Sequence, residues 1–279
     1  MSITTLSQNI VKSYDGTDIY CVKNEAVIEN GIVIIVHGLA EHLKRYDYAA
    51  EKFTEANLTV YRYDNRGHGK SGGERAHLND FNDFILDADS IVEYVKHEKP
   101  NVPVFMLGHS MGGFITAAYG VKYKNKINGQ VLSGAATMQP EQVKGINGKF
   151  LEISNKILPK FKVKNDLADI ISRNIEVVNN YKEDPFVLKK ITAKFYYEFL
   201  VKGILWLNKN LKEYKYPCLV LHGGDDKIIN NEASKNFINK ISSTDKNLKV
   251  YDGLYHEILN EKERDIVIND IISWIYERI

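Results

Sequence analysis

The sequence has little of several features that would narrow its class. Only two of its 279 residues are cysteine, Cys21 and Cys218, and they lie far apart. Two cysteines cannot form the disulfide framework of a small secreted domain, so a reduced, cytoplasmic setting is expected. The N-terminus has no charged segment followed by an apolar one, so no signal peptide is predicted. The most apolar run, Ile32–Val36, is far too short to span a bilayer.

The chain also lacks an excess of charge of either sign. It carries 37 Lys and Arg against 36 Asp and Glu, a net charge of +1. A chain this balanced has no overall field that would attract nucleic acid, so no nucleic-acid partner is expected. Apolar residues make up 44% and charged residues 26%, which is ordinary for a globular protein and excludes a disordered, collagen-like or coiled-coil chain.

Short apolar runs alternate with helical patterns along the chain. Every residue of Ile32–Val36 is β-branched, which is typical of a strand buried on both faces of a parallel sheet. Gln8–Ser13 and Ile19–Lys23 flank a turn at Asp15-Gly16 and predict a β-hairpin. Further strands are expected at Leu58–Tyr63, Val104–Leu107, Gly129–Leu132, Cys218–Leu221 and Leu248–Tyr251, and helices at Tyr46–Ala56, Phe81–His97, Met111–Lys124, Glu232–Ile241 and Glu261–Ile279. This alternation predicts an α/β fold, with a mostly parallel sheet and helices on both faces.

One stretch interrupts the alternation. Residues 139–215 contain no buried-strand run, and Phe186–Leu207 has a mostly helical apolar spacing. We therefore predict that residues 1–138 and 216–279 form the core and that residues 139–215 form an inserted helical cap. The cap holds 15 Lys and Arg against 9 Asp and Glu. Its Lys160–Lys164 segment mixes cations with apolar residues, which predicts peripheral contact with an anionic membrane, a solvated helical face being the alternative.

The strongest chemical motif is Gly108-His109-Ser110-Met111-Gly112, a G-x-S-x-G sequence. It follows an expected strand and precedes an expected helix, the context of a nucleophile elbow. A serine needs a base and a group that orients the base, and for a nucleophile elbow in this kind of fold the expected chain order is Ser, Asp or Glu, His. His256 follows the last expected strand and is the predicted base.

The acid and the oxyanion-binding groups can also be placed. Asp225 and Asp226 both follow a strand end, and their position alone does not separate them. His222, just before them, is predicted to make a structural hydrogen bond. The oxyanion hole needs backbone N–H groups, and the candidates are Met111 and Leu39.

Three motifs suggest other chemistry but do not fit it. Gly67–Gly72 matches G-x-G-x-x-G without opening a helix, and the same segment lacks the first glycine of a phosphate-binding loop. His256-Glu257 starts an H-E-x-x-H zinc motif, but Asn260 occupies its fifth position. We expect neither cofactor nor metal.

Together, five motifs make the sequence similar to the monoacylglycerol lipase and lysophospholipase group of α/β-hydrolases. They are His37–His42, Arg45-Tyr46, Tyr63–Ser71, Gly108–Gly113 and Tyr255-His256, and they occur in that order. The resemblance implies an α/β-hydrolase fold with a helical cap. It selects Asp226 as the acid, because the family acid stands three residues after the glycine that ends its strand, here Gly223. It also places the second oxyanion donor on Leu39, although the family often has glycine where this chain has Ala40.

The expected function is hydrolysis of a carboxylic ester through an acyl-enzyme, with a monoacylglycerol or lysophospholipid as substrate. Aromatic and aliphatic cap residues would suit an acyl chain or form the core of the cap: Phe195, Phe199, Ile204 and Trp206. One alternative is a small-ester or aminopeptidase-like amide hydrolase, with amine-holding carboxylates among Glu152, Asp166, Asp169 and Glu198. Another is a non-catalytic binder of small molecules on the same fold.

Overall fold

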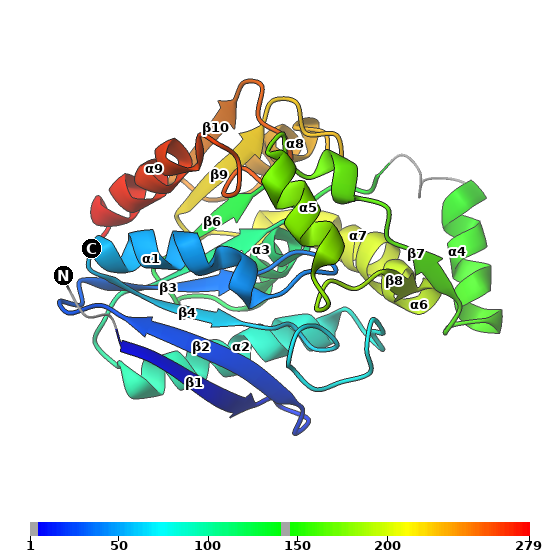
Figure 1. Ribbon diagram of the computed structural model, residues 1–279, viewed down its shortest axis with the longest axis horizontal. Helices are drawn as coiled ribbons and strands as arrows, with labels where there is room; N and C mark the ends of the chain where they lie inside the picture. Colours follow the sequence, from blue (N-terminus) through cyan, green and yellow to red (C-terminus); the bar gives the residue numbers. More distant parts are fainter. Residues whose placement is uncertain (1–4, 141–145) are drawn as a thin grey trace.

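The computed structural model describes residues 5–140 and 146–279, and an eight-stranded sheet forms its centre (Figure 1). The strand order is β1-β2-β4-β3-β5-β6-β9-β10. The pairs β1–β2 and β2–β4 are antiparallel, and all the other pairs are parallel. The strands are β1 (Thr5–Lys12), β2 (Asp18–Glu25), β3 (Gly31–Val36), β4 (Leu58–Tyr63), β5 (Val104–His109), β6 (Gly129–Ser133), β9 (Cys218–Gly223) and β10 (Lys246–Tyr251). The predicted hairpin, parallel strands and α/β class are confirmed.

Helices cover both faces of the sheet because its central strands are apolar on both sides. In β3, Val33 and Ile35 pack on one face, whereas Ile32, Ile34 and Val36 pack on the other. The first face is covered by α1 (Asp47–Glu55) and α9 (Arg264–Tyr276), and the second by α2 (Asn82–Glu98), α3 (Met111–Lys122) and α8 (Glu232–Lys240). The loops that carry the candidate site therefore extend from a sheet that is packed between helices on both faces.

A long insertion separates β6 from β9, although these two strands pair directly. Figure 1 shows its elements gathered along one side of the sheet. They are α4 (Ile146–Ile157), β7 (Lys162–Lys164), α5 (Ile175–Glu183), β8 (Lys190–Thr192), α6 (Ala193–Tyr196), a π-helical turn (Tyr197–Gly203) and α7 (Ile204–Asn210). Short 3₁₀ turns complete the chain at Leu43–Tyr46, Ala168–Ile170 and Leu211–Glu213.

The helical pattern expected over Phe186–Leu207 is wrong at its start. Lys190–Thr192 forms a strand that pairs with β7, and the helical segment begins only at Ala193. Three residues are too few for apolar periodicity to distinguish a strand from a helix. The division into a core and a cap at residues 139–215 stays a prediction. Residues 1–4 and 141–145, which include Gly145, lie outside the described residues.

In the described part of the chain, no helix combines the length and the apolar character needed to cross a bilayer. Both cysteines are buried and free.

The start of α3 lies unusually close to β3. A Cβ atom placed on Gly112 would lie 2.0 Å from the carbonyl oxygen of Val36, and one placed on Gly108 would lie 2.2 Å from the carbonyl oxygen of Gly112. Neither distance leaves room for a side chain, so these two glycines allow the strand, the turn and the helix to pack together.

Replacing Gly112 by Ala is expected to lower the free energy of unfolding by about 3 kcal/mol, because the new methyl group must push α3 away from β3. Urea denaturation followed by circular dichroism measures this change. Gly31→Ala is the control: the nearest atom to its new Cβ would be the flexible tip of Leu58 at 3.2 Å, and the next ones lie at an ordinary 3.6 Å. Equal stability of the two variants would contradict the proposed close contact.

Candidate active site

Ser110 occupies the turn between β5 and α3 in a strained backbone conformation. Its φ is +53° and its ψ is −115°, a region that residues with a side chain rarely adopt. The turn is held by the Ser110 N–H, which donates to the Ser133 carbonyl at 2.9 Å, and by the Ser110 carbonyl, which accepts from Phe114 N and Ala136 N. The predicted strand–turn–helix geometry is present, and Ser110 lines a cavity.

Asp226 and His256 lie side by side above the carboxyl end of the sheet. His256 Nδ1 is 2.7 Å from Asp226 Oδ2, and the Asp226 side chain is fully buried. Asp226 Oδ1 accepts from the backbone N–H groups of Ile228 and Ile229 at 2.8 and 2.9 Å. Asp225 is exposed instead. The structure thus brings Asp226 to His256 and leaves Asp225 facing solvent.

The two groups shift each other's pKa in opposite directions. Burial alone raises the pKa of the Asp226 carboxyl, but the neighbouring His256 and His222 hold it well below its usual range. Burial alone lowers the pKa of His256, but the charge of Asp226 and the hydrogen bond to it keep that pKa above its ordinary value. An ionised Asp226 therefore favours a proton on His256, as a general base requires.

Leu39 lies in a loop in which, within the described chain, the two neighbouring N–H groups have acceptors and its own does not. The Gly38 N–H donates to Glu41 Oε1, and the Ala40 N–H donates to His68 Nε2 at 3.2 Å. Between them, the Leu39 N–H has no acceptor among the described residues. The loop also touches the serine, since a Cβ placed on Gly38 would lie 3.2 Å from Ser110 Cβ.

Met111 supplies a second free donor beside this loop. It is the first residue of α3, so its N–H has no intrahelical acceptor. The two predicted oxyanion donors therefore come from loops that contact each other. Ala40 has a φ of +66°, the conformation for which the related family often uses glycine.

Buried histidines support these loops in a neutral form. Burial lowers the pKa of His68 to about 3, so its Nε2 can accept the Ala40 N–H. Burial likewise lowers the pKa of His37, whose Nε2 accepts from Asn65 N at 2.9 Å. Burial and the nearby His256 lower the pKa of His109 to about 3, and the two rings are 4.7 Å apart.

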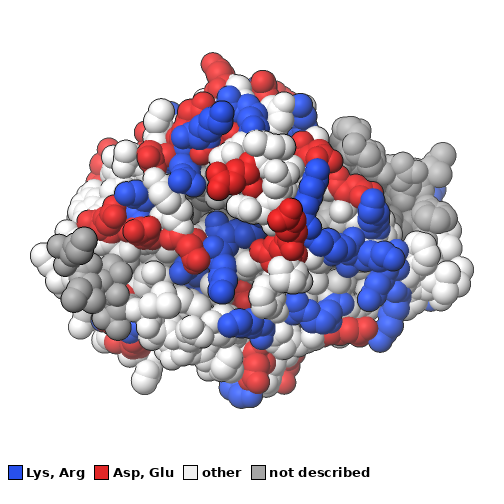
Figure 2. All heavy atoms as spheres, viewed as in Figure 1, with Lys and Arg blue, Asp and Glu red and all other residues white. Residues whose placement is uncertain are grey.

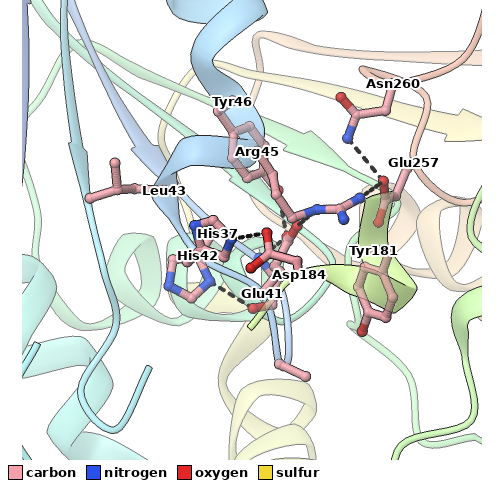
Figure 3. Close-up of polar contacts among 12 residues, drawn as sticks. His37, Glu41, His42, Leu43, Arg45, Tyr46, Tyr181, Asp184, Glu257 and Asn260 are labelled. Carbon is pink, nitrogen blue, oxygen red and sulfur yellow. Dashed lines mark hydrogen bonds and ion pairs between the residues drawn. The ribbon is translucent and has the colours of Figure 1, made fainter. Parts of the chain in front are cut away.

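A buried ion network joins the Leu39 loop to the His256 loop (Figure 3). Arg45 Nε donates to Glu41 Oε2 at 2.9 Å, and its Nη2 donates to Glu257 Oε2. The Tyr181 ring covers the Arg45 guanidinium at 4.7 Å. Two carboxylates share one cation here, so the network leaves a net negative charge close to His256.

The inserted segment is tied to both loops. The Leu188 N–H donates to the Ala40 carbonyl at 2.8 Å, and His42 Nε2 lies 2.7 Å from Asp184 Oδ2. On the other side, the Glu257 N–H donates to the Ile171 carbonyl at 2.8 Å. Residues flanking α5 therefore hold the Leu39 loop and the His256 loop in fixed positions.

These elements enclose a cavity of about 370 Å³ that holds Ser110 and His256. Its apolar wall comes from Met138, Leu167, Ile170, Phe199, Leu200, Ile228 and Ile229. Of the cap residues expected to hold an acyl chain, only Phe199 lines the cavity. Phe195 and Ile204 are buried in the core, and Trp206 packs on Phe81, so for these three the alternative of core packing applies.

Sequence reasoning missed Glu257 and Tyr181, which line the cavity. Glu257 is separated from its partner Arg45 by 212 residues, and no local pattern reports such a pair. Within the described residues, no cluster of three or more His, Cys, Asp or Glu side chains could hold a metal ion.

Comparison with known proteins adds to this geometry. A family model described as "Serine aminopeptidase, S33" matches residues 28–263. The chain is 38% identical over 254 residues to a monoacylglycerol lipase of Mycolicibacterium smegmatis, covering 89% of each chain. It is 30% identical over 242 residues to a phospholipase of Bacillus subtilis, covering 85% of this chain and 91% of the other.

A solved structure also agrees over almost the whole chain. The crystal structure of a monoacylglycerol lipase from Paleococcus ferrophilus has a TM-score of 0.84 and 29% sequence identity. The match covers 94% of this chain and 99% of that one.

Replacing Glu257 by Gln is expected to lower the pKa of His256, because it removes one of the negative charges that raise it. NMR titration of the His256 imidazole measures the change. Glu263→Gln is the matched control, since that carboxylate is exposed and pairs with Arg173. A His256 pKa that stays in place or rises in Glu257→Gln would show that the network does not act on His256.

Proposed function

This chain belongs to the monoacylglycerol lipase group of the α/β-hydrolases and is a carboxylic ester hydrolase, and we propose that it cleaves monoacylglycerols with Ser110, His256 and Asp226 as its catalytic triad. The observation that carries the proposal is the strained Ser110 turn facing the same cavity as the His256–Asp226 pair. The mechanism follows from the roles that these groups can take.

In the first half-reaction, His256 removes the proton of the Ser110 hydroxyl while Oγ attacks the ester carbonyl. The Leu39 and Met111 N–H groups bind the oxyanion that forms. His256 then gives its proton to the departing alcohol, and an acyl-enzyme remains. In the second half, His256 activates water, which releases the fatty acid. Asp226 stays ionised throughout and stabilises the imidazolium.

A neutral alcohol fits the polar end of the cavity better than an anionic headgroup. Glu41 and Glu257 carry two negative charges against one positive charge on Arg45. A phosphate close to them would be repelled, whereas glycerol hydroxyls can donate hydrogen bonds to both carboxylates. Two lysines in the cavity wall lie outside this network: Lys164 pairs with Asp166, and Lys227, which is exposed, donates to the Tyr255 hydroxyl. We therefore favour monoacylglycerol over lysophospholipid.

The cavity also argues against an aminopeptidase-like reaction. Among the four carboxylates that could hold an amine, only Asp166 lines the cavity. Glu198 is buried between Lys194 and Lys202, while Glu152 and Asp169 pair with surface lysines: Lys156 and Lys182. A binder without turnover would need neither the strained serine nor the buried acid beside the base.

The expected peripheral membrane contact has a matching surface beside the cavity. Ile157, Leu158 and Phe161 are 60 to 70% exposed. The exposed Lys162 follows them, and Lys160 and Lys164 are also exposed although they pair with Glu74 and Asp166. Figure 2 shows positive side chains at the end of the molecule that carries β7 and β8. We propose that residues 157–164 touch an anionic lipid surface while the cap segment, residues 139–215, receives the lipid. A cytoplasmic location, compatible with two buried free thiols, is part of the proposal.

Ser110→Ala is expected to lower turnover at least about 10⁴-fold without unfolding the protein, because the nucleophile is lost and the turn remains. The measurement is fatty-acid release from a monoacylglycerol and from a lysophospholipid of equal chain length. Ser90→Ala, at a half-buried position of α2 outside the cavity, is the control and should keep full activity. Ordinary turnover in folded Ser110→Ala would refute the triad, and faster release from the lysophospholipid would refute the neutral leaving group.

Phe161→Asp is expected to weaken binding to phosphatidylserine vesicles about tenfold. The substitution removes an aromatic side chain that would enter the lipid surface, and it adds a negative charge that the anionic lipid repels. Vesicle flotation measures binding. Ile175→Asp, an equally exposed apolar residue outside residues 157–164, is the control. Equal flotation of the two variants, or none by the unaltered protein, would contradict this surface.

A further inference from the structure

His222 is a buried histidine that the mechanism above does not use. It lies in β9, four residues before Asp226, and its side chain is completely inaccessible to solvent. Its expected structural hydrogen bonds are present: Nδ1 is 2.7 Å from Ser234 Oγ, and Nε2 is 2.8 Å from the Ile229 carbonyl oxygen. A further contact goes beyond that expectation, because Nε2 is also 3.1 Å from Asp226 Oδ2.

The neighbours of His222 determine where its hydrogen lies. The Ile229 carbonyl and the ionised Asp226 carboxylate can only accept, so Nε2 carries a hydrogen. The Ser234 hydroxyl, which can both donate and accept, is the partner of Nδ1. His222 therefore presents an N–H group that is shared between the Ile229 carbonyl and Asp226 Oδ2.

The same oxygen serves both imidazoles. Asp226 Oδ2 is 2.7 Å from His256 Nδ1, and Oδ1 is already taken by the N–H groups of Ile228 and Ile229. Because the carboxylate is fully buried, no bulk water replaces a missing donor. His222 thus limits both the rotation of the carboxylate and the share of its negative charge that His256 experiences.

We propose that His222 is a positioning residue, which fixes the Asp226 carboxylate against His256 and draws part of its charge away, so that His256 loses its proton more readily. The inference rests on the proposed triad. It does not assign to His222 any contact with substrate.

Other charged or titratable groups also act on His256, and the test must leave them unchanged. They are Asp226 in the β9–α8 loop, His109 in β5, Glu257 in the same loop as His256, and Glu41 in the Leu39 loop. None of the substitutions below alters these residues, so a change in the titration of His256 reports the contact with His222.

Two substitutions of His222 place a side-chain amide at different distances from the backbone. In His222→Gln, the side-chain amide can extend to the position of Nε2 and still donate to Asp226. In His222→Asn, the shorter amide reaches only the position of Nδ1, so it keeps Ser234 and loses Asp226. His77→Gln is the matched control, because His77 is buried and contacts the Thr192 hydroxyl at 3.1 Å, away from the triad.

The experiment is the pH dependence of kcat/KM for fatty-acid release, with active sites counted by a fluorophosphonate probe. His222→Asn is expected to lower kcat about tenfold per titrated site, the effect of one lost hydrogen bond to a buried charge. The acid limb of its pH profile, which reports the titration of His256, should move to higher pH. Without the donor from His222, the full charge of Asp226 stabilises the protonated His256. His222→Gln should stay within about threefold of the unaltered protein, with its acid limb in place. The acid limb of His77→Gln should stay in place as well.

An unchanged acid limb in titrated His222→Asn would overturn the proposal and leave His222 a purely structural residue. Equal shifts in the Asn and Gln variants would also overturn it, because the effect would then not depend on the donor to Asp226. Failure of the triad itself gives a different result: the unaltered protein would not react with the probe, or Ser110→Ala would keep its turnover.

Discussion

The close approach of α3 to β3 and β5 is the constraint on which the rest of the site depends. Gly108 and Gly112 leave no space for a Cβ atom, so the backbone can turn abruptly and hold Ser110 at a φ of +53°. The turn places the serine at the carboxyl edge of the sheet, where loops from several parallel strands meet. The Leu39 loop then contacts Ser110, and the β9 and β10 strands deliver Asp226 and His256 to the same cavity.

Two groups of charged side chains surround that turn, one around Asp226 and one around Arg45. The Asp226 side chain is inaccessible to solvent, and its oxygens are within hydrogen-bond distance of two backbone N–H groups and two imidazoles. Farther out, Arg45 holds Glu41 and Glu257 together and joins two loops that are distant in sequence. Burial and neighbouring charge keep His109 and His68 neutral, so they support the loops without adding charge. The position and the basicity of His256 thus depend on the same contacts.

Most of the sheet, and the chain order of the three residues of the proposed triad, could be predicted from the sequence for physical reasons. Strands buried on both faces are mostly apolar, as in β3 and the Val104–Leu107 part of β5, and G-x-S-x-G indicates a local turn. The separation of Asp226 from Asp225 depended on family resemblance, because adjacent carboxylates look alike until the loop is folded. Glu257 and Tyr181 could not be found, since their partner Arg45 meets them only through tertiary packing. The strand Lys190–Thr192 was missed because it is too short to show a period.

The hydrogen bonds between the inserted segment and the core determine what happens when that segment is exchanged between related enzymes. The carbonyl of Ile171 and the N–H of Leu188 complete the backbone bonding of the loops that carry His256 and Leu39. The Tyr181 ring also shields the cation that joins those loops. The segment therefore supports the proposed site as well as covering it. A chimera that exchanges residues 139–215 between relatives would receive new cavity walls and, with them, new supports for the loops that carry His256 and Leu39.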